Sequence, residues 1–435
     1  MNKAIKKTCA FYTFGCKVNQ YETQFIREQF LKQGFVETKE KPAYYIVNGC
    51  TVTSAADRKC RYLLRSLHKK NPQAKIIITG CFAKNNPNIK KQNMGISQVI
   101  EPGQKSMLID IAQNNINDRI IDPLAKDKKL NSLRKEMITD FQAHSRAFVK
   151  VQDGCDNFCS YCIVPYMRGL PMSRAIKVII KEVTGLVNKG FKEIVLTGIN
   201  LGMWGSESGK VNGKLPELIN QLVKIKQLKR LRLSSVEFAH VDDLLIEQFK
   251  KSKKICAHLH IPLQSGDDDI LKKMNRRYNR VLFLNRINQI KQAIPRICFT
   301  TDIMVGFPGE TEENLNNTID IVKKAGFLKV HIFPFSPRPG TPAARMPEQI
   351  DKKIKDKYKK NLAEISKQTS FEVRKKLLNT KLIVLFEELS KDGYWMGYSD
   401  NYVQIKLKSA QNLKNLILPI KISRVTADDT IGILA

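Results

Sequence analysis

The stretch Gly154-Cys155-Asp156-Asn157-Phe158-Cys159-Ser160-Tyr161-Cys162 decides how the rest of this chain is interpreted. Its cysteines are spaced Cys-x3-Cys-x2-Cys, close enough for three thiolates to hold one small inorganic cluster. Four cysteines fill every iron of a 4Fe–4S cube, whereas three leave one iron open to bind a small molecule. The alternative is a structural zinc site, which needs four closed ligands. No second Cys pair or Cys/His pair lies nearby, because His144 is isolated, so the spacing favours the cluster.

The composition indicates a globular protein with a polyanionic partner. The 435 residues suffice for roughly two or three domains, and 42% hydrophobic residues allow ordinary cores. No apolar run approaches the about 18 residues of a membrane helix, and no signal sequence follows the basic start, so we expect a cytoplasmic protein without membrane contact. Ten cysteines then indicate metal binding or catalysis more than disulfides. The net charge of +33 favours nucleic acid, although 54 lysines against 20 arginines also fit a genomic bias.

Three short hydrophobic runs near the N-terminus each end in a Gly-Cys pair. The runs and their cysteines are 8–14 with Cys16, 44–47 with Cys50, and 76–79 with Cys81. Helical patterns at Glu22–Gln33 and Ser54–Lys70 separate the runs, which indicates a parallel α/β sheet. Parallel strands end along one edge, so the three cysteines are expected to converge there. One such cysteine would more simply be a small buried hydrophobe, but three in the same placement predict a second cluster site.

The remaining cysteines lack this context, and we assign them to cores or surfaces. They are Cys9, Cys60, Cys256 and Cys298.

Both cysteine groups, in this order, resemble a known enzyme family. The Cys-x3-Cys-x2-Cys spacing is typical of the radical S-adenosylmethionine (SAM) superfamily, and a preceding α/β domain with three strand-end cysteines resembles the methylthiotransferases. The run Gly15-Cys16-Lys17-Val18-Asn19-Gln20 is similar to the branch that modifies N6-threonylcarbamoyladenosine. The isopentenyladenosine branch reads more like Gly-Cys-Gln-Met-Asn, and the ribosomal-protein branch more like Gly-Cys-Pro-Lys-Asn. Blocks at 261–266 with 274–278, at 301–311 and at 335–343 strengthen the resemblance.

The resemblance implies two cofactor types and a reaction. Two 4Fe–4S clusters would be held by Cys16, Cys50 and Cys81, and by Cys155, Cys159 and Cys162. One SAM methylates sulfur at the first cluster, and a second SAM at the other cluster is cut to a 5′-deoxyadenosyl radical. The methylthio group joins carbon 2 of N6-threonylcarbamoyladenosine at position 37, in the tRNA anticodon loop. This carbon needs a radical because no acid or base removes its hydrogen near neutral pH. The implied partners are tRNA and an electron donor such as a flavodoxin or ferredoxin.

From 141 to 371 strand and helix patterns alternate, which fits an open partial (β/α)6 barrel, the usual architecture of the superfamily. Chemistry in such barrels lies at the carboxyl ends of the strands. The polar residues at those ends are Asn200, Ser235, Glu237, Gln264, Ser265 and Asp302. By the resemblance, the first five are the candidates for holding SAM. An ordinary cap or turn explains any single one of them equally well.

The predicted fold class is α/β, in four segments. They are an N-terminal methylthiotransferase domain with a parallel sheet (1–121), a linker (122–140), the radical SAM core (141–371) and a small C-terminal barrel (372–435). The last segment has short β patterns separated by turns such as Asp392-Gly393, which predicts a β-barrel. In the family a TRAM domain, a small RNA-binding barrel, lies there. After Cys162 the chain keeps only Arg168 and Arg174 of the arginines usual in the family, which weakens the expectation of RNA-phosphate contacts from that loop.

The substrate assignment depends on charge. A threonylcarbamoyl group carries a carboxylate and needs a cation or several donors, whereas an isopentenyl group needs an apolar site. Lys17 and Arg338 are candidate cations, although a lysine in a loop is more often simply solvated. The open alternatives are methylthiolation of isopentenyladenosine, an iron–sulfur electron carrier or regulator, and an RNA-binding protein whose clusters are structural.

Overall fold

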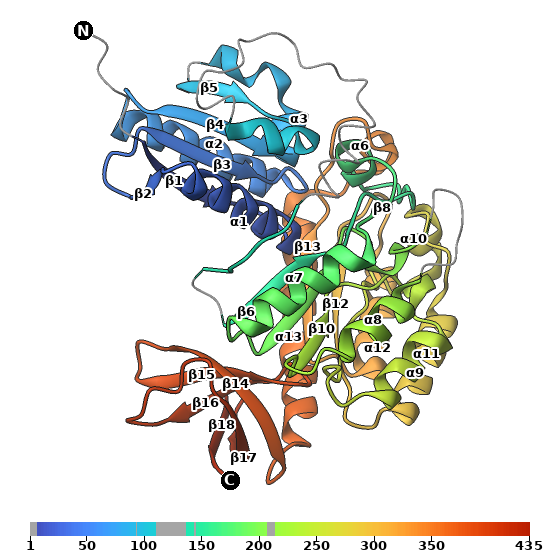
Figure 1. Cartoon of the computed structure of the whole chain (residues 1–435). Coiled ribbons are helices and arrows are strands. Elements are labelled where there is room, and N and C mark those ends of the chain that lie inside the picture. Colours follow the sequence, from blue (N-terminus) through green and yellow to red (C-terminus); the bar gives the residue numbers. More distant parts are fainter. Residues whose placement is uncertain (1–6, 93, 110–135, 143–144, 207–213) are drawn as a thin grey trace, which may run out of the picture.

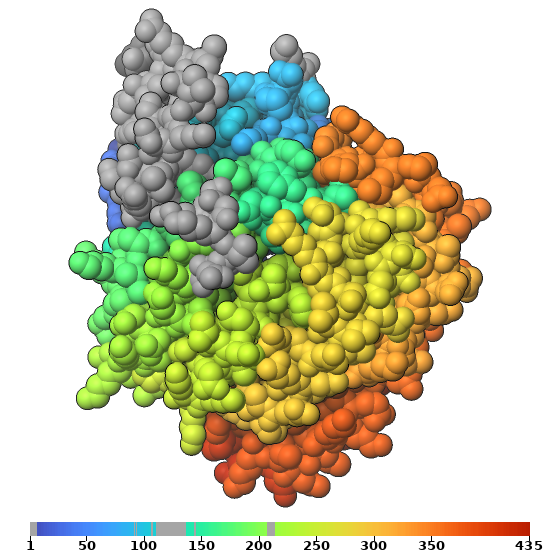
Figure 2. Space-filling model, turned by 90° about the vertical axis from the view of Figure 1, so that its right-hand side faces the viewer, coloured from blue at the N-terminus to red at the C-terminus, as the bar shows by residue number. Residues whose placement is uncertain are grey.

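The computed structural model describes residues 7–92, 94–109, 136–142, 145–206 and 214–435. Within them lie an N-terminal parallel sheet, a central curved sheet and a closed C-terminal β-barrel, which confirms the predicted fold class. The N-terminal sheet and the β-barrel lie at opposite ends of the central region (Figures 1 and 2). Residues 122–135 of the predicted linker lie outside the described residues, and the domain boundaries stay predictions.

The N-terminal sheet has five parallel strands in the order β2-β1-β3-β4-β5. They are β1 (Thr8–Thr13), β2 (Val36–Glu37), β3 (Tyr44–Gly49), β4 (Lys75–Gly80) and β5 (Ile96–Val99). Helix α1 (Lys17–Lys32) packs Phe30 against Ile46 on one face. Helix α2 (Ser54–Lys70) packs Leu64 against Val47 on the other face. Because neighbouring residues of a strand point to opposite faces, β3 is buried along its whole length.

Shorter elements complete this domain and lead into the next one. They are α3 (Cys81–Asn85), η1 (Pro87–Gln92), η2 (Pro102–Met107), β7 (Gln152–Asp153), α6 (Val164–Arg168) and β8 (Met172–Ser173). Helix α3 packs against α6, so the segments that begin at Cys81 and that follow Cys162 are neighbours in space.

The central region has six parallel strands in the order β6-β9-β10-β11-β12-β13. They are β6 (Arg146–Lys150), β9 (Glu193–Thr197), β10 (Arg230–Leu233), β11 (His258–His260), β12 (Cys298–Val305) and β13 (Lys329–Pro334). Hydrogen bonds define two groups of three strands, and a parallel bridge between Ser235 and His260 joins the groups. This arrangement is the predicted partial (β/α)6 barrel.

Helices follow most of these strands and cover the outer face of the curved sheet (Figure 1). They are α7 (Ile176–Asn188), η3 (Leu201–Met203), α8 (Leu215–Val223), η4 (Phe238–His240), α9 (Asp243–Lys251), α10 (Asp268–Lys273), α11 (Arg280–Ala293), α12 (Glu312–Ala325) and η5 (Pro342–Arg345).

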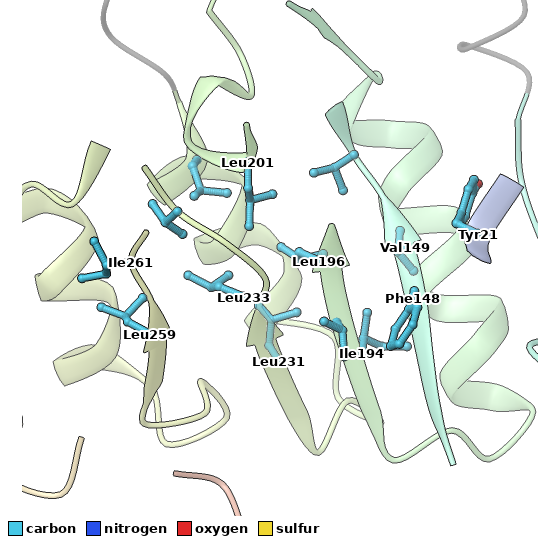
Figure 3. Packing of buried hydrophobic residues seen from close by; sticks show 14 of the residues in the cluster. Tyr21, Phe148, Val149, Ile194, Leu196, Leu201, Leu231, Leu233, Leu259 and Ile261 are labelled. Carbon is cyan, nitrogen blue, oxygen red and sulfur yellow. The ribbon is translucent and has the colours of Figure 1, made fainter. Parts of the chain in front are cut away.

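Strand alternation separates the core of the central region from its inner face. Ile194, Leu196, Leu231 and Leu233 lie together in one apolar layer (Figure 3). Residues next to them on the same strands, such as Val195 and Arg232, line an inner cavity, which Leu233 also borders. The apolar layer continues into the N-terminal domain, where Tyr21 of α1 lies near β6 (Figure 3). Its hydroxyl donates to Glu182 Oε1 at 2.8 Å, which ties α1 to α7.

The long helix α13 (Lys352–Lys375) leads to the C-terminal barrel, which closes in the order β14-β15-β16-β18-β17. The strands are β14 (Lys381–Leu389), β15 (Tyr394–Ser399), β16 (Gln404–Lys408), β17 (Ile417–Val425) and β18 (Thr430–Leu434). The barrel has its own apolar core, which includes Phe386 and Ile420. It docks through arginines of the central strands: Arg230 donates to Tyr398 O and Arg232 to Ser399 O, each at 3.0 Å. None of the described helices is long and apolar enough to cross a lipid bilayer.

Candidate functional site

The register of the N-terminal sheet brings three cysteines to one edge. Thr13 pairs with Asn48 and Asn48 with Thr79, so β1, β3 and β4 end at the same level. The cysteines that follow, Cys16, Cys50 and Cys81, line a single cavity of about 610 Å³. The predicted convergence is therefore what the strand register produces.

Two glycines allow this close approach. Gly15 has φ +100°, and a Cβ placed on it would lie 2.7 Å from Cys50 Cβ. Gly80 has φ +84°, and its Cβ would lie 2.2 Å from Asn48 Oδ1. A side chain at either position would be strained and would push the cysteine-bearing loops apart.

The second group of cysteines lies on the loop after β7. The Cys155 N–H donates to Gly169 O at 3.0 Å, and the Cys162 N–H donates to Cys159 O at 2.9 Å. Ser160, between them, donates through its hydroxyl to Lys273 O at 2.7 Å. These bonds hold the loop in a compact turn against the strand ends of the central region.

Burial raises the pKa of thiols in both cysteine groups. Burial, with a smaller contribution from Cys159, raises the pKa of Cys155 to about 11 and that of Cys162 to about 12. In the N-terminal group, burial raises the pKa of Cys50 to about 12, and Cys81 and Cys16 add to that shift. A coordinating metal deprotonates a thiol outright, so a cluster would reverse these shifts.

Both groups fit an iron–sulfur cluster. All six cysteines are free, and soft thiolates favour iron and sulfide. Within the described residues, no group of three or more His, Cys, Asp or Glu side chains is arranged to hold a single metal ion. A 4Fe–4S cube is larger than one ion, and its ligands stand further apart. Polar hydrogens also point at the sulfurs: Arg276 Nη1 lies 3.4 Å from Cys159 Sγ, and Asn200 Nδ2 lies 3.9 Å from Cys155 Sγ.

Arg168 connects the two groups. Its side chain is fully buried at the end of α6, and its Nε donates to Cys81 Sγ at 3.2 Å. Its Nη1 donates to Glu22 Oε1 at 2.6 Å and lies 3.4 Å from Asp153, two residues before Cys155. Arg168, Lys105 and Lys150 together overcome burial and hold the pKa of Glu22 well below its usual range. One guanidinium therefore contacts a cysteine of the N-terminal group and the strand that leads to the other group.

The two arginines that follow the cysteine loop, Arg168 and Arg174, lie inside the protein. Arg168 and Arg174 are both buried, and Arg174 Nη1 donates to Glu182 Oε2 at 2.7 Å. The sequence had already weakened the expectation of phosphate contacts from this loop, and the structure uses both arginines inside the protein. The positions match the family, but their role is to pair buried carboxylates.

The five candidate SAM residues occupy different environments. Asn200 contacts Cys155, and its Oδ1 is buried without a hydrogen-bond partner among the described residues. Glu237 forms an ion pair with Arg276, which itself contacts Cys159. Ser235 lines the 610 Å³ cavity.

Gln264 and Ser265 are not among the described residues that line that cavity. Gln264 has φ +65° and bridges Ile303, and Ser265 Oγ accepts from the Asp267 N–H at 3.2 Å, at the start of α10. All five assignments stay predictions.

Sequence reasoning missed a polar wall inside the central sheet. Thr300 Oγ1 lies 2.9 Å from His258 Nε2 and 2.9 Å from His260 Nδ1. His260 Nε2 also lies 3.2 Å from Asp302, and Tyr402 of the C-terminal barrel stacks on His258 with ring centroids 4.4 Å apart. Part of the signal was present, because His258 and His260 flank Leu259 in β11, and alternate residues of a strand share a face.

The comparisons with known proteins agree with this geometry. The family described as Radical SAM superfamily matches residues 149–322, and the one described as Uncharacterized protein family UPF0004 matches residues 8–101. A Bacillus subtilis protein named threonylcarbamoyladenosine tRNA methylthiotransferase is 36% identical over 95% of this chain and 93% of its own length. A protein of the same name from Thermotoga maritima is 38% identical, over 92% of this chain and 91% of its own.

The chain belongs to the radical SAM methylthiotransferases. It is therefore an enzyme, and enzymes of this family use SAM and 4Fe–4S clusters. The interpretations as an electron carrier or as a purely RNA-binding protein are set aside. The sister branch is also similar: a tRNA-2-methylthio-N(6)-dimethylallyladenosine synthase from Lachnoclostridium phytofermentans is 33% identical over 94% of this chain and 92% of its own length.

Solved structures support the fold of this methylthiotransferase. A radical S-adenosylmethionine methyltransferase from Kitasatospora setae, solved with cobalamin and a [4Fe-4S] cluster, has a TM-score of 0.56 at 13% identity. The match covers 78% of this chain and 77% of that one. At this identity the likeness concerns the arrangement of strands and helices alone.

Proposed function

We propose that this enzyme methylthiolates carbon 2 of N6-threonylcarbamoyladenosine at position 37 of tRNA. The observation that carries the proposal is the pairing of two three-cysteine groups through Arg168, at the strand ends of two adjoining parallel sheets. A radical step and a sulfur-donating step on the same base need their two centres close together, because correct positioning lowers the barrier of each step. Near-full-length relatives that carry the threonylcarbamoyladenosine name support the choice of substrate.

The cysteine groups would hold one cluster each. Cys155, Cys159 and Cys162 would hold the cluster that binds SAM, and Cys16, Cys50 and Cys81 would hold the one beside the sulfur to be transferred. When bound, the two clusters and SAM would supply a carbon-centred radical for hydrogen removal and a sulfur atom for the product.

The protein itself positions and shields these centres. Arg276 and Asn200 direct N–H groups at sulfurs of the central loop, which favours the charged thiolates. Arg168 does the same for Cys81 from a fully buried position. Burial of these donors keeps water away, and electrostatic interactions are stronger where water is excluded. The residues thus fix both sites before substrate arrives.

The 610 Å³ cavity is the candidate site for the target base. It joins the N-terminal cysteines to the inner face of the central strands. A base in an anticodon loop is single-stranded and can be splayed into such a pocket. The charge of +33 suits a phosphate backbone, and a cytoplasmic location with a flavodoxin-like or ferredoxin-like electron donor fits this substrate.

A direct assay tests the proposal. Reconstituted enzyme is incubated with SAM, a reductant and anticodon stem-loops bearing either N6-threonylcarbamoyladenosine or isopentenyladenosine, and nucleosides are measured by mass spectrometry. The methylthio product is expected from the first RNA and not from the second. Comparable conversion of the isopentenyl RNA would assign the enzyme to the sister branch. Cys298→Ala is the matched control, since Cys298 is a buried core cysteine outside both groups.

A further inference from the structure

Lys17 lies in the wall of the cavity and has no ionic or hydrogen-bond partner among the described residues. It is the first residue of α1 and follows directly on Cys16. It lines the 610 Å³ cavity and is only partly exposed. Its ammonium makes no hydrogen bond or ion pair with any residue that the structure describes, unlike the buried lysines Lys105 and Lys150, which pair with Glu22.

The other strong bases near this cavity are already paired. Arg146 lies 2.5 Å from Glu387, and Arg232 Nε donates to Glu193 Oε1 at 2.6 Å. Arg338, the other cation considered from the sequence, is buried and lies 3.1 Å from Asp57. Among the described residues that line the cavity, Lys17 is therefore the strong base that is available to a ligand.

The surroundings of Lys17 suit a polar ligand. His260 and His331 lie in the same wall with ring centroids 5.8 Å apart, and Asp302 lies 3.2 Å from His260. Buried polar atoms in the wall have no hydrogen-bond partner among the described residues, namely Ser234 Oγ and His258 Nδ1. Buried polar groups are normally paired, and leaving them against an apolar group is costly. The cavity thus offers donors, acceptors and one free positive charge.

We propose that Lys17 binds the carboxylate of the substrate's N6-threonylcarbamoyl group and is the residue that distinguishes this base from isopentenyladenosine. The inference rests on the proposed function and names its specificity determinant. The hydroxyl and carbamoyl groups of the same substituent match the histidine, serine and aspartate groups of the wall. An isopentenyl group would leave Lys17 and those polar atoms unpaired, and a site built for polar contacts rejects a ligand that lacks them.

A carboxylate-masked substrate isolates this contact. Binding of the reconstituted holoenzyme is measured by fluorescence anisotropy with two anticodon stem-loops, one bearing N6-threonylcarbamoyladenosine and the other its methyl ester. The wild-type enzyme is expected to bind the free acid about tenfold or more tightly than the ester. The reason is that a hydrogen bond to a charged group is stronger than one to a neutral group. Lys17→Met is expected to bring the ratio close to one. Lys32→Met is the matched control, because Lys32 is exposed at the other end of α1, and it should keep the wild-type ratio.

The ratio within each variant separates specificity from folding. A damaged Lys17→Met protein would bind both RNAs weakly, whereas the inference requires that ester binding stays at the wild-type level. An unchanged acid preference in Lys17→Met, or none in the wild type, overturns the inference. The proposed function fails separately, if the wild-type enzyme makes no methylthio product from the free-acid RNA.

Discussion

The two cysteine groups, each of which is proposed to hold one cluster, are built in opposite ways. Cys155, Cys159 and Cys162 lie on one short loop, and their relative positions depend on local backbone bonds such as the one from Cys162 N–H to Cys159 O. Cys16, Cys50 and Cys81 come from three strand ends, and they meet only because β1, β3 and β4 pair in one register. A register slip of one residue would turn side chains to the other face of the sheet. The first group is therefore a property of a segment, and the second is a property of a domain.

We call Cys155, Cys159 and Cys162 the local group, and Cys16, Cys50 and Cys81 the dispersed group. The largest expected effect follows from removing the local group. Cys155→Ala, Cys159→Ala and Cys162→Ala together should abolish 5′-deoxyadenosine formation and remove about half of the iron, because one of two clusters loses all its ligands. Iron analysis and chromatography of SAM products measure both. SAM cleavage by this variant would show that the radical chemistry lies elsewhere.

Removing the dispersed group should separate the two half-reactions. Cys16→Ala, Cys50→Ala and Cys81→Ala together should stop methylthio transfer and leave SAM cleavage largely in place, since radical formation needs only the local group. Nucleoside mass spectrometry and 5′-deoxyadenosine quantification give the two readouts. Loss of all iron would mean that the six cysteines form one shared site, and the two groups would not be separate cluster sites.

Arg168 tests whether the two groups are coupled. Arg168→Met should lower the free energy of unfolding by about 3 kcal/mol or more, because it removes one cation from the buried ion-pair network that holds Glu22 and Asp153. Denaturant titration measures the loss. Arg65→Met, on the exposed side of α2, should change it by less than about 0.5 kcal/mol. A loss equal to that of the control would mean that the groups are held independently.

The smallest expected effect is a pH dependence of stability, and it is expected near the local group only. Burial raises the pKa of Glu310 to about 7, and Phe307 beside it packs in the cluster that contacts Tyr161 of the cysteine loop. The pKa of Glu310 is higher in the folded protein than in the unfolded chain. The contribution of Glu310 to the free energy of unfolding is therefore fully present below about pH 4.5 and is lost as pH rises through about 7. Relative to wild type, Glu310→Gln should gain about 1–3 kcal/mol between pH 5 and 8.

Hydrogen exchange of the peptides around Tyr161 and around Cys50 would locate this effect. Opening at high pH should increase around Tyr161 in the wild type and not around Cys50. Glu313→Gln, an exposed neighbour on α12, should follow the wild-type profile. Parallel profiles for Glu310→Gln and wild type would contradict the assignment.

Local patterns predicted most regular elements well. The helix predicted over Ser54–Lys70 has those bounds, and the run 76–79 lies within β4. The four cysteines outside the two groups are all buried, which confirms their assignment to cores or surfaces. Within the run 258–266, strand β11 ends at His260. Pro262 lacks an N–H and Gln264 takes a positive φ, so the chain leaves the sheet there.

The sequence by itself determined the chemistry of this enzyme, because only soft thiolates at those spacings and strand ends can hold two clusters. It also determined the order of strands and helices, because hydrophobic periodicity is local. The tertiary structure alone decided that Arg168 is a buried link, that Arg338 pairs with Asp57, and that Lys17 lines the cavity without a partner among the described residues. Those facts depend on which distant segments pack together, and the periodicity of a single segment carries no information about its neighbours in space.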